Sequence, residues 1–448
     1  MYKIIMRAHT SPLEAVPSYK VIIKNLIGSN SGNLIFAHSV ARIIMTEGTQ
    51  IDTFRTSDWT DTPEELSKVA EYYNETYDMM ILPLANAIRV SFIDDLKLMT
   101  KVIRQLTIPC VVIGVGIQTN LEKDLTNKRL AKVTKKFIRS VLEKSAMVGV
   151  RGEITGDYLK SLGFIPEKDY TVIGCPSLFM YGRNLPVPME RGLTQRSRVA
   201  CNSKIQLPQN FHDFMYRSLN AIPDHYYIPQ VIEEIRRMYI GLPYPKEFNK
   251  NRIPNYFPAG MFSTVYKNDR GLAMTNVVSW IEFLSEMDFC FGSRIHGNIA
   301  GILAGVPVHI FVSDARIMEL VDYHHIPYTM IRDIDDSTNI FEIYERSDHT
   351  SVLDGHEARF MHFLDFLRVN GVKSVFDAEG NSKHYYFDDV IKNQIFDPPV
   401  HSFVGSPLIE KAHRCVYAIR YRRIRSKKEN KGAENDGSVD QEAEIVEV

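Results

Sequence analysis

One short segment of the chain combines residue types that can hold an anion with one that can move a proton. Ser293, Arg294 and His296 follow an apolar run, and Gly297 and Asn298 open a stretch of small residues. This pattern predicts a strand that turns into a helix, whose free N–H groups attract anions. Arginine fits carboxylate or phosphate, and histidine exchanges protons near neutral pH. We therefore expect an anion site beside an acid–base group. The alternative is a capping serine with an arginine and a histidine that only pack.

A glycine-rich turn early in the chain could contribute to the same kind of site. Gly28, Asn30, Gly32 and Asn33 lie between an expected strand and an expected helix. Backbone N–H groups in such turns can cradle a phosphate or another polar ligand. The turn matches neither the GxGxxG nor the Walker pattern, so an ordinary tight turn is the alternative.

Polar side chains also follow other expected strands, and the carboxyl ends of parallel strands gather such residues at one edge of a sheet. Arg151 follows the expected strand at residues 147–150 and could supply a second cation, unless it pairs with Glu153 or Asp157. Candidates for further donor or acceptor contacts are Asn86, Arg89, Gln118 and Arg316.

The elements that must position these residues alternate between strands and helices. Expected strands occupy residues 19–26, 51–54, 79–84, 110–115, 147–150, 170–173, 198–202, 226–228, 289–292, 308–312 and 328–331. Expected helices occupy residues 34–45, 63–74, 92–105, 130–143, 153–162, 212–220, 230–238, 277–286, 297–304 and 315–323. Strands rich in Val and Ile, separated by helices, favour parallel sheets that are covered on both faces.

We therefore predict an α/β fold of two Rossmann-like domains that face each other across a cleft, which would hold the site. A proline-containing linker at residues 184–197 separates the domains, and residues 240–258 are expected to form a long loop, as a lid or a plain insertion. The expected parts are an N-terminal domain at 1–185, a C-terminal domain with the donor site at 198–385, an extension with a basic segment at 386–428 and an acidic, disordered tail at 429–448.

Composition excludes several classes of protein. The chain has 448 residues, with 53 Lys and Arg against 54 Asp and Glu, and this net charge of −1 argues against a nucleic-acid partner. The five cysteines form no CxxC pair, which fits reduced thiols and supports neither a disulfide framework nor a zinc ribbon. We also expect no signal peptide and no membrane span, and thus a cytoplasmic protein.

The basic segment at residues 411–428 holds eight Lys or Arg residues and no acid, interleaved with apolar residues. A basic amphipathic helix can lie on an anionic membrane surface, which here would be the inner face of the membrane. The alternative is a solvated basic face, or one that pairs with the acidic tail.

Four blocks of sequence together resemble the polysaccharide pyruvyl transferase family. They are GSNSGNLI, VGVRGEITGDYLKSLGF, GSRIHGNIAGILAGVP and DARIMELVDYHHIP, and the resemblance covers about residues 20–330. It implies two Rossmann-like domains arranged as in GT-B glycosyltransferases. It also implies transfer of a pyruvyl group from phosphoenolpyruvate to two hydroxyls of a sugar in a glycan or polysaccharide precursor, such as a capsule or exopolysaccharide, which forms a cyclic ketal.

The same resemblance implies that Arg294 and His296 form the donor-site pair, with Arg151 as a second anion contact. Arg294 would hold the phosphate or carboxylate, and His296 would act as a general acid or as a base at the hydroxyl. The donor is a substrate, so we expect neither a cofactor nor a metal. Many members of the family have Gly-Asp where this chain has Gly32-Asn33, which leaves Asn86 as a candidate for a sugar or donor contact.

Two other functions fit the same fold. A GT-B-like glycosyltransferase would use a nucleotide sugar, and retaining enzymes of that class often carry two Glu eight residues apart near the end of the second domain. No such pair occurs between Glu282 and Glu345, which disfavours this alternative. A non-catalytic binding protein is the other alternative, and the presence of both Arg294 and His296 argues against it. The acceptor is expected to be a glycan or a lipid-linked sugar.

Overall fold

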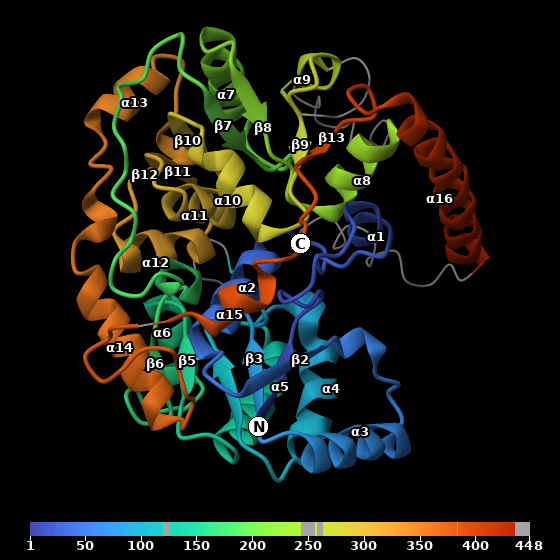
Figure 1. Ribbon diagram of the computed structural model, residues 1–448, viewed down its shortest axis with the longest axis vertical. Helices are drawn as coiled ribbons and strands as arrows, with labels where there is room; N and C mark the ends of the chain where they lie inside the picture. The colour runs from blue at the N-terminus through green and yellow to red at the C-terminus, as the bar shows by residue number, and fades with distance from the viewer. Residues whose placement is uncertain (120–125, 243–255, 258–262, 383, 435–448) are drawn as a thin grey trace.

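The computed structural model describes residues 1–119, 126–242, 256–257, 263–382 and 384–434. Two parallel sheets lie one above the other in Figure 1, with helix α2 (Gly32–Ile44) between them. The α/β fold with two parallel sheets confirms the predicted fold class. The domain boundaries at residues 185, 198 and 385 stay predictions.

The first sheet has the parallel strand order β2-β1-β3-β4, and the parallel pair β5-β6 continues from it where Val115 bridges to Val150. Its strands are β1 (Tyr2–Arg7), β2 (Thr49–Phe54), β3 (Met79–Pro83), β4 (Cys110–Ile113), β5 (Val148–Val150) and β6 (Tyr170–Val172). Its helices are α1 (Ser18–Ile23), α2, α3 (Pro63–Thr76), α4 (Ile93–Ile103), α5 (Lys128–Leu142) and α6 (Glu153–Ser161).

The second sheet has the parallel order β12-β11-β10-β7-β8. Its strands are β7 (Val199–Asn202), β8 (His225–Tyr227), β10 (Phe289–Gly292), β11 (Val308–Val312) and β12 (Tyr328–Met330). Its helices are α7 (Gln209–Ala221), α8 (Ile232–Ile240), α10 (Val277–Ser285), α11 (Ile295–Leu303), α12 (Ala315–His324) and α13 (Ile340–Arg346). The short helix α9 (Thr264–Lys267) precedes β9 (Leu272–Ala273), which pairs antiparallel with β13 (Val400–His401).

Both faces of each sheet are buried, which explains why the strands read as apolar runs. In β1, Ile4 and Met6 join one hydrophobic cluster, and Ile5 between them joins another. Cys290 and Phe291 divide in the same way between two clusters around the second sheet. Successive strand residues point to opposite faces, so this division places a packed core on each side.

The expected first strand was wrong. Residues 18–23 form helix α1, and the strand that begins the first sheet is β1, which pairs with both β2 and β3. The β-branched run that includes Val21 and Ile22 favours a strand by propensity. Its buried residues instead lie along one helix face and continue to Ile27, so tertiary burial decided the conformation.

The segment at residues 184–197 connects the two sheets without helix or strand, as expected of a linker. Two later segments of the chain then contact the first sheet again. One lies in the part predicted as the C-terminal domain and the other in the part predicted as the extension. Helix α14 (His356–Val369) leads to Asn370, whose side-chain oxygen accepts hydrogen bonds from the N–H groups of Ala146 and Met147 at 3.0 and 3.1 Å. Helix α15 (Tyr386–Ile391) lies on α2, where Asp388 pairs with Arg42 at 2.7 Å.

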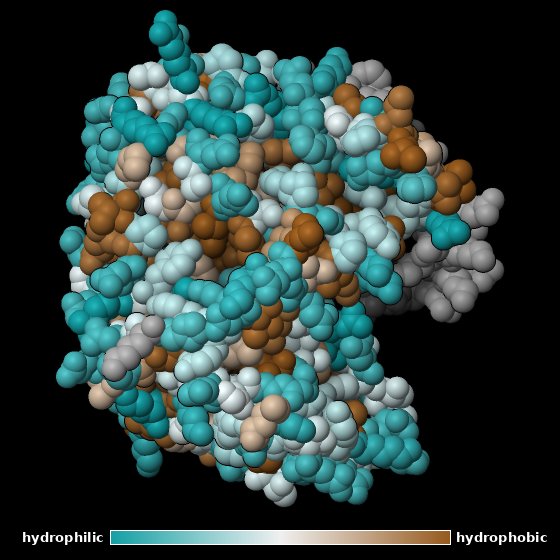
Figure 2. All heavy atoms as spheres, viewed as in Figure 1, coloured by the Kyte–Doolittle hydropathy of each residue, from teal (hydrophilic) through white to brown (hydrophobic). Residues whose placement is uncertain are grey.

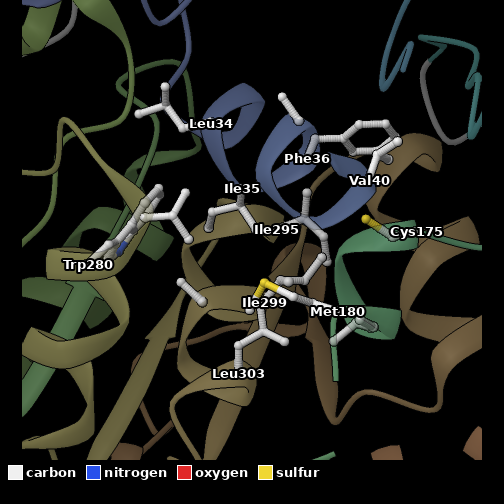
Figure 3. Close-up of a cluster of buried hydrophobic side chains, with 14 of the residues drawn as sticks. Leu34, Ile35, Phe36, Val40, Cys175, Met180, Trp280, Ile295, Ile299 and Leu303 are labelled. Carbon is white, nitrogen blue, oxygen red and sulfur yellow. The ribbon is translucent and has the colours of Figure 1, made fainter. Parts of the chain in front are cut away.

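The interface between the sheets is apolar where α2 meets α11. Figure 3 shows Ile35 and Phe36 of α2 beside Ile295 and Ile299 of α11, with Trp280 of α10 closing one side. These side chains are almost fully buried. The two sheets are therefore joined by a continuous core rather than by a linker alone.

Helix α16 (Leu408–Glu434) runs along the outside of α8 (Figure 1). Tyr421 donates a hydrogen bond to Glu233 of α8 at 2.7 Å, and the buried Arg414 donates to the Tyr239 carbonyl at 3.2 Å. The basic segment at 411–428 thus lies within a helix, with side chains described as far as residue 421. The acidic tail was expected to be disordered at 429–448, but residues 429–434 continue helix α16. Residues 435–448 and most of the expected loop at 240–258 lie outside the described residues. Across the described part of the chain, no helix is both long and apolar enough to span a membrane.

Candidate active site

A cleft of about 910 Å³ opens between the two sheets at the carboxyl ends of their strands. Arg7 ends β1, Arg151 follows β5, and Lys204 lies just beyond β7. Arg294 and Arg316, on the same second-sheet wall as Lys204, reach the cleft at the starts of α11 and α12. Cations from five strand ends therefore meet in one cavity, as the parallel topology dictates.

Arg294 is held from both directions at the start of α11. Its backbone N–H donates to Asn202 Oδ1 at 2.7 Å, and its Nε donates to the Ser203 carbonyl at 3.0 Å. Its Nη2 lies 3.1 Å from Glu234 Oε1. Burial raises the pKa of Glu234, and Arg294 opposes that rise. The guanidinium is thus fixed at the cleft wall with a buried partner behind it.

His296 lies in the first turn of α11, half-buried at the cleft wall. Burial, together with the nearby Arg151 and Arg316, lowers the pKa of its imidazole to about 3, so the ring is neutral at neutral pH. Its Nε2 lies 3.9 Å from Cys175 Sγ. Burial raises the pKa of that thiol, so Cys175 stays protonated. The expected histidine is in the cleft, but in a form that can accept a proton rather than give one.

The glycine-rich turn positions both histidines of the cleft by close approach. A Cβ atom on Gly32 would lie 2.7 Å from His296 Nδ1, and one on Gly28 would lie 2.0 Å from Cδ2 of His9. Gly28 also has a φ of 59°, which favours glycine. Asn33 shapes the turn by donating from Nδ2 to the Gly28 carbonyl at 2.9 Å. Gly28, Asn30 and Asn33 line the cleft, whereas Gly32 lies behind the His296 ring.

Arg151 is committed to a buried ion pair that sequence did not predict. Its Nε lies 2.9 Å from Oε1 of Glu319 in α12, with side-chain exposures of 2% and 0%. Glu319 Oε2 also accepts hydrogen bonds from the N–H and hydroxyl of Thr155 at 3.0 and 2.9 Å. Glu153 and Asp157, the alternative partners expected from sequence, are not its partner. The pair joins the end of β5 to the second sheet and holds Arg151 at the cleft.

Of three other residues that were expected to contact the donor, one lines the cleft and two pack behind the turn. Ser293 lines the cleft, and its buried hydroxyl has no hydrogen-bond partner among the described residues. Gly297 faces Gln230 and Asn202, so close that a Cβ would lie 2.2 Å from the Gln230 amide. Asn298 donates to the Arg294 carbonyl at 2.9 Å. Neither Gly297 nor Asn298 lines the cleft. Both instead support the turn, Gly297 by allowing the close approach of Gln230 and Asn298 by its hydrogen bond to Arg294.

Asn86 joins two of the expected arginines. With its amide oxygen turned toward them, it accepts hydrogen bonds from Arg316 Nη1 at 3.1 Å and Arg89 Nη1 at 3.2 Å. The amide of Gln118 contacts Asn86 at 2.9 Å but does not line the cleft. Arg316 also pairs with Asp314 at 3.1 Å. Asn86, Arg89 and Arg316 therefore act as one polar group, with Gln118 behind them.

Sequence reasoning missed Arg7, His9 and Lys204. Lys204 Nζ lies 2.7 Å from Asp314 Oδ2, and burial lowers its pKa to about 8. Burial alone would raise the pKa of Asp314, but the adjacent Arg316 and Lys204 hold it well below its usual range. Lys204 comes just after the predicted strand at 198–202, and this position at a strand end could have identified it as a cleft residue. Arg7 ends β1 and His9 follows it, and the sequence did not predict this strand.

No group of three or more His, Cys, Asp or Glu side chains in the described residues is arranged to hold a metal ion. The lining of the cleft offers cations, hydrogen-bond donors and a neutral imidazole. Such a set suits a small ligand with several negative charges and a reaction that transfers a proton.

A sequence model of the polysaccharide pyruvyl transferase family matches residues 30–314, which is more than half of the 448 residues. No curated protein matches the chain in sequence. Among solved structures, S. aureus MnaA with UDP has 9% sequence identity and a TM-score of 0.45, covering 89% of this chain and 100% of its own. The UDP-GlcNAc 2-epimerase of Neisseria meningitidis bound to UDP-GlcNAc has 11% identity and a TM-score of 0.44, covering 83% and 100%.

Proposed function

The chain belongs to the polysaccharide pyruvyl transferase family, and from that premise we propose that it moves a pyruvyl group from phosphoenolpyruvate to two hydroxyls of a sugar. The product would be a cyclic ketal on a glycan or polysaccharide precursor. The observation that carries the proposal is the cationic cleft with Arg294 and a neutral His296 at the start of α11. Phosphoenolpyruvate has a carboxylate and a phosphate, and the cleft wall at the start of α11 offers arginine side chains and helix N–H groups for both.

The donor would bind against the second-sheet wall. Arg294 is fixed there by Glu234 and Asn202, and Lys204 and Arg316 share the single carboxylate of Asp314. Two cations with one counter-charge leave a net positive charge for the donor phosphate. The unpartnered hydroxyl of Ser293 adds a donor at the same place.

The reaction requires a proton to move from a sugar hydroxyl to the donor. The first hydroxyl oxygen forms a bond to C2 of phosphoenolpyruvate, while C3 gains a proton and becomes the methyl group. The second hydroxyl oxygen then bonds to C2 as the C2–O bond to phosphate breaks, and its proton leaves with the phosphate. His296, neutral before the donor binds, takes the first hydroxyl proton and returns it to C3. The cations stabilise the charge that develops on the leaving phosphate.

Arg294→Ala is expected to weaken phosphoenolpyruvate binding by about 10–100-fold, since hydrogen bonds to charged groups are among the strongest in proteins. Calorimetric titration of the purified protein measures this. Because the substitution leaves Glu234 buried without a partner, Arg294→Ala combined with Glu234→Gln is the matched variant, and it should bind the donor as weakly. Wild-type affinity in the double variant would remove Arg294 from the donor site.

The same titration, run with UDP- and GDP-sugars, tests the alternative of glycosyl transfer. We expect phosphoenolpyruvate to bind, and we expect no binding of the nucleotide sugars that depends on Arg294. Binding of a nucleotide sugar alone would favour a glycosyltransferase, and the likeness to the family would then be one of fold.

We further propose that α16 holds the protein against an anionic membrane surface. Tyr417 and Tyr421 pack toward α8, whereas the opposite face exposes apolar side chains, each more than half exposed. These are Leu408, Ile409, Val416 and Ile419. Figure 2 shows hydrophobic residues gathered at this edge of the molecule, over the described part of α16. An apolar stripe within a helix that carries eight cations between residues 411 and 428 complements anionic lipid.

Val416→Glu combined with Ile419→Glu is expected to reduce binding to vesicles that contain anionic phospholipid by about tenfold or more. Two negative charges would replace apolar side chains that the membrane would otherwise bury. Sedimentation with such vesicles and with neutral ones measures the effect. Val369→Glu, at an exposed apolar residue of α14, is the matched control and should bind normally. Deleting residues 411–448 should abolish binding. Unchanged binding after that deletion would end the proposal.

A further inference from the structure

Two arginines on the first-sheet wall of the cleft have no carboxylate partner in the described part of the chain. Arg7 and Arg89 both contact the Phe92 ring, with their guanidinium carbons 5.5 and 5.3 Å from its centroid. The Nε atoms of both are buried without a hydrogen-bond partner, and neither arginine forms an ion pair with a described residue. Burial lowers the pKa of Arg7 to about 10, and burial together with Arg316 does the same to Arg89.

The remaining buried cations of the cleft have carboxylates of their own. Arg294 pairs with Glu234, and Arg151 pairs with Glu319. Asp95 also lines the cleft but does not reach ion-pair distance of Arg7 or Arg89, and its Oδ1 accepts from the Thr56 hydroxyl at 2.6 Å. Buried donors without partners are costly, and two neighbouring cations repel each other. An anion from outside the chain would satisfy both demands.

The position of this pair separates it from the donor wall. Arg7 ends β1 and Arg89 follows β3, both in the first sheet, whereas Arg294 and Lys204 follow strands of the second. A donor with three carbons fills only a small part of a 910 Å³ cleft. The cation Lys24 lines the same cleft and extends its positive lining. The unfilled volume therefore has a second cationic surface.

We propose that Arg7 and Arg89, which both contact Phe92, form a second anion subsite that binds a phosphate or diphosphate ester carried by the acceptor. This rests on the proposed function, in which the acceptor sugar must enter the cleft beside the donor. Arginine forks bind phosphate oxygens in pairs, and contact with an aromatic ring helps to orient each guanidinium. The subsite would place the acceptor hydroxyls at a fixed distance from the donor wall and exclude glycans without a phosphate group.

Calorimetric titration with inorganic pyrophosphate and with phosphoenolpyruvate tests this subsite. Arg7→Gln and Arg89→Gln are each expected to weaken pyrophosphate binding by about tenfold or more, and Arg7→Gln should leave phosphoenolpyruvate binding nearly unchanged. Arg294→Ala should give the reverse pattern. Loss of phosphoenolpyruvate binding in Arg7→Gln as large as in Arg294→Ala would overturn the proposal, as would normal pyrophosphate binding in both glutamine variants.

A measurement on the unaltered protein covers the case in which a variant does not fold. Phosphoenolpyruvate affinity, measured with saturating pyrophosphate present, should stay within about threefold of its value alone if two subsites exist, whereas full competition would overturn the second subsite. Pyrophosphate binding that depends on Arg7, without any donor binding, would refute the donor and leave the subsite standing. A short polyprenyl diphosphate and a sugar 1-phosphate then distinguish a lipid-linked acceptor from a soluble one.

Discussion

His296→Gln is expected to lower kcat by about 10²–10⁴-fold with little change in phosphoenolpyruvate affinity, which is the range for loss of a general acid–base group. Glutamine is close to histidine in size and can keep the packing against Gly32 and Phe36. It cannot take and return a proton. Phosphate release from phosphoenolpyruvate in the presence of the acceptor glycan measures kcat, and calorimetry measures the donor affinity separately.

His309→Gln is the matched control, because His309 is also a buried histidine whose pKa burial lowers to about 3. It lies in β11, where it contacts the hydroxyls of Ser347 and Thr329 at 2.8 and 2.9 Å, and it does not line the cleft. The control should lose stability but keep kcat. Wild-type kcat in His296→Gln would show that the imidazole takes no part in the chemistry.

The ionisation of His296 adds a second test. Burial holds its pKa near 3 in the free protein, so the imidazole stays neutral between about pH 5 and 8. The kcat/KM profile reports groups of the free protein and free substrate. The ratio of kcat/KM between the wild type and His296→Gln should therefore stay constant over that range. A ratio that falls as the pH drops through about 6.5 would mean that the ring titrates normally.

Glu319→Gln is expected to destabilise the protein by about 3–5 kcal/mol, which is the cost of leaving one member of a buried ion pair without its partner. The substitution keeps an oxygen for Thr155 but leaves the Arg151 guanidinium uncompensated at 2% exposure. Chemical denaturation measures the free energy of unfolding.

Glu342→Gln provides the comparison, since Glu342 pairs with Arg346 at 3.3 Å on the surface of α13. Exposed pairs contribute about 0–1 kcal/mol, so this variant should be nearly as stable as the wild type. Replacing both buried partners, by Arg151→Met with Glu319→Leu, should recover much of the lost stability. Equal stability of the two glutamine variants would show that the buried pair does not hold the domains together.

The unit that carries Arg294 and His296 could be predicted from sequence because its signals are local. A buried run, a glycine turn and a stretch of small residues predicted a strand at 289–292 and a helix at 297–304, and β10 and α11 span Phe289–Gly292 and Ile295–Leu303. The start of α12 is a local signal of the same kind, because the Asp314 side chain caps the helix by accepting from the Ile317 N–H at 3.1 Å.

The rest depended on contacts between distant parts of the chain. Arg151 and Glu319 are 168 residues apart, and Arg294 and Glu234 are 60 apart, so a single sequence does not reveal either pair. The strand β1 was missed because its central place in the sheet comes from pairing with β2 and β3, and Arg7 was missed with it. The turn glycines were expected to make room for a ligand, whereas Gly28 and Gly32 make room for imidazole rings.

The burial of His296 makes its proton affinity a property of the domain arrangement. The ring belongs to α11 in the second half of the chain, but Gly32 and Phe36, which pack against it, belong to α2 in the first. An open form in which α2 had separated from α11, at the cost of the apolar core between them, would hydrate the imidazole and return its pKa toward 6.5. The open form would then hold a proton on the ring at mildly acidic pH and the closed form would expel it. Acid would therefore favour the open form, which couples solution pH to domain motion through one side chain.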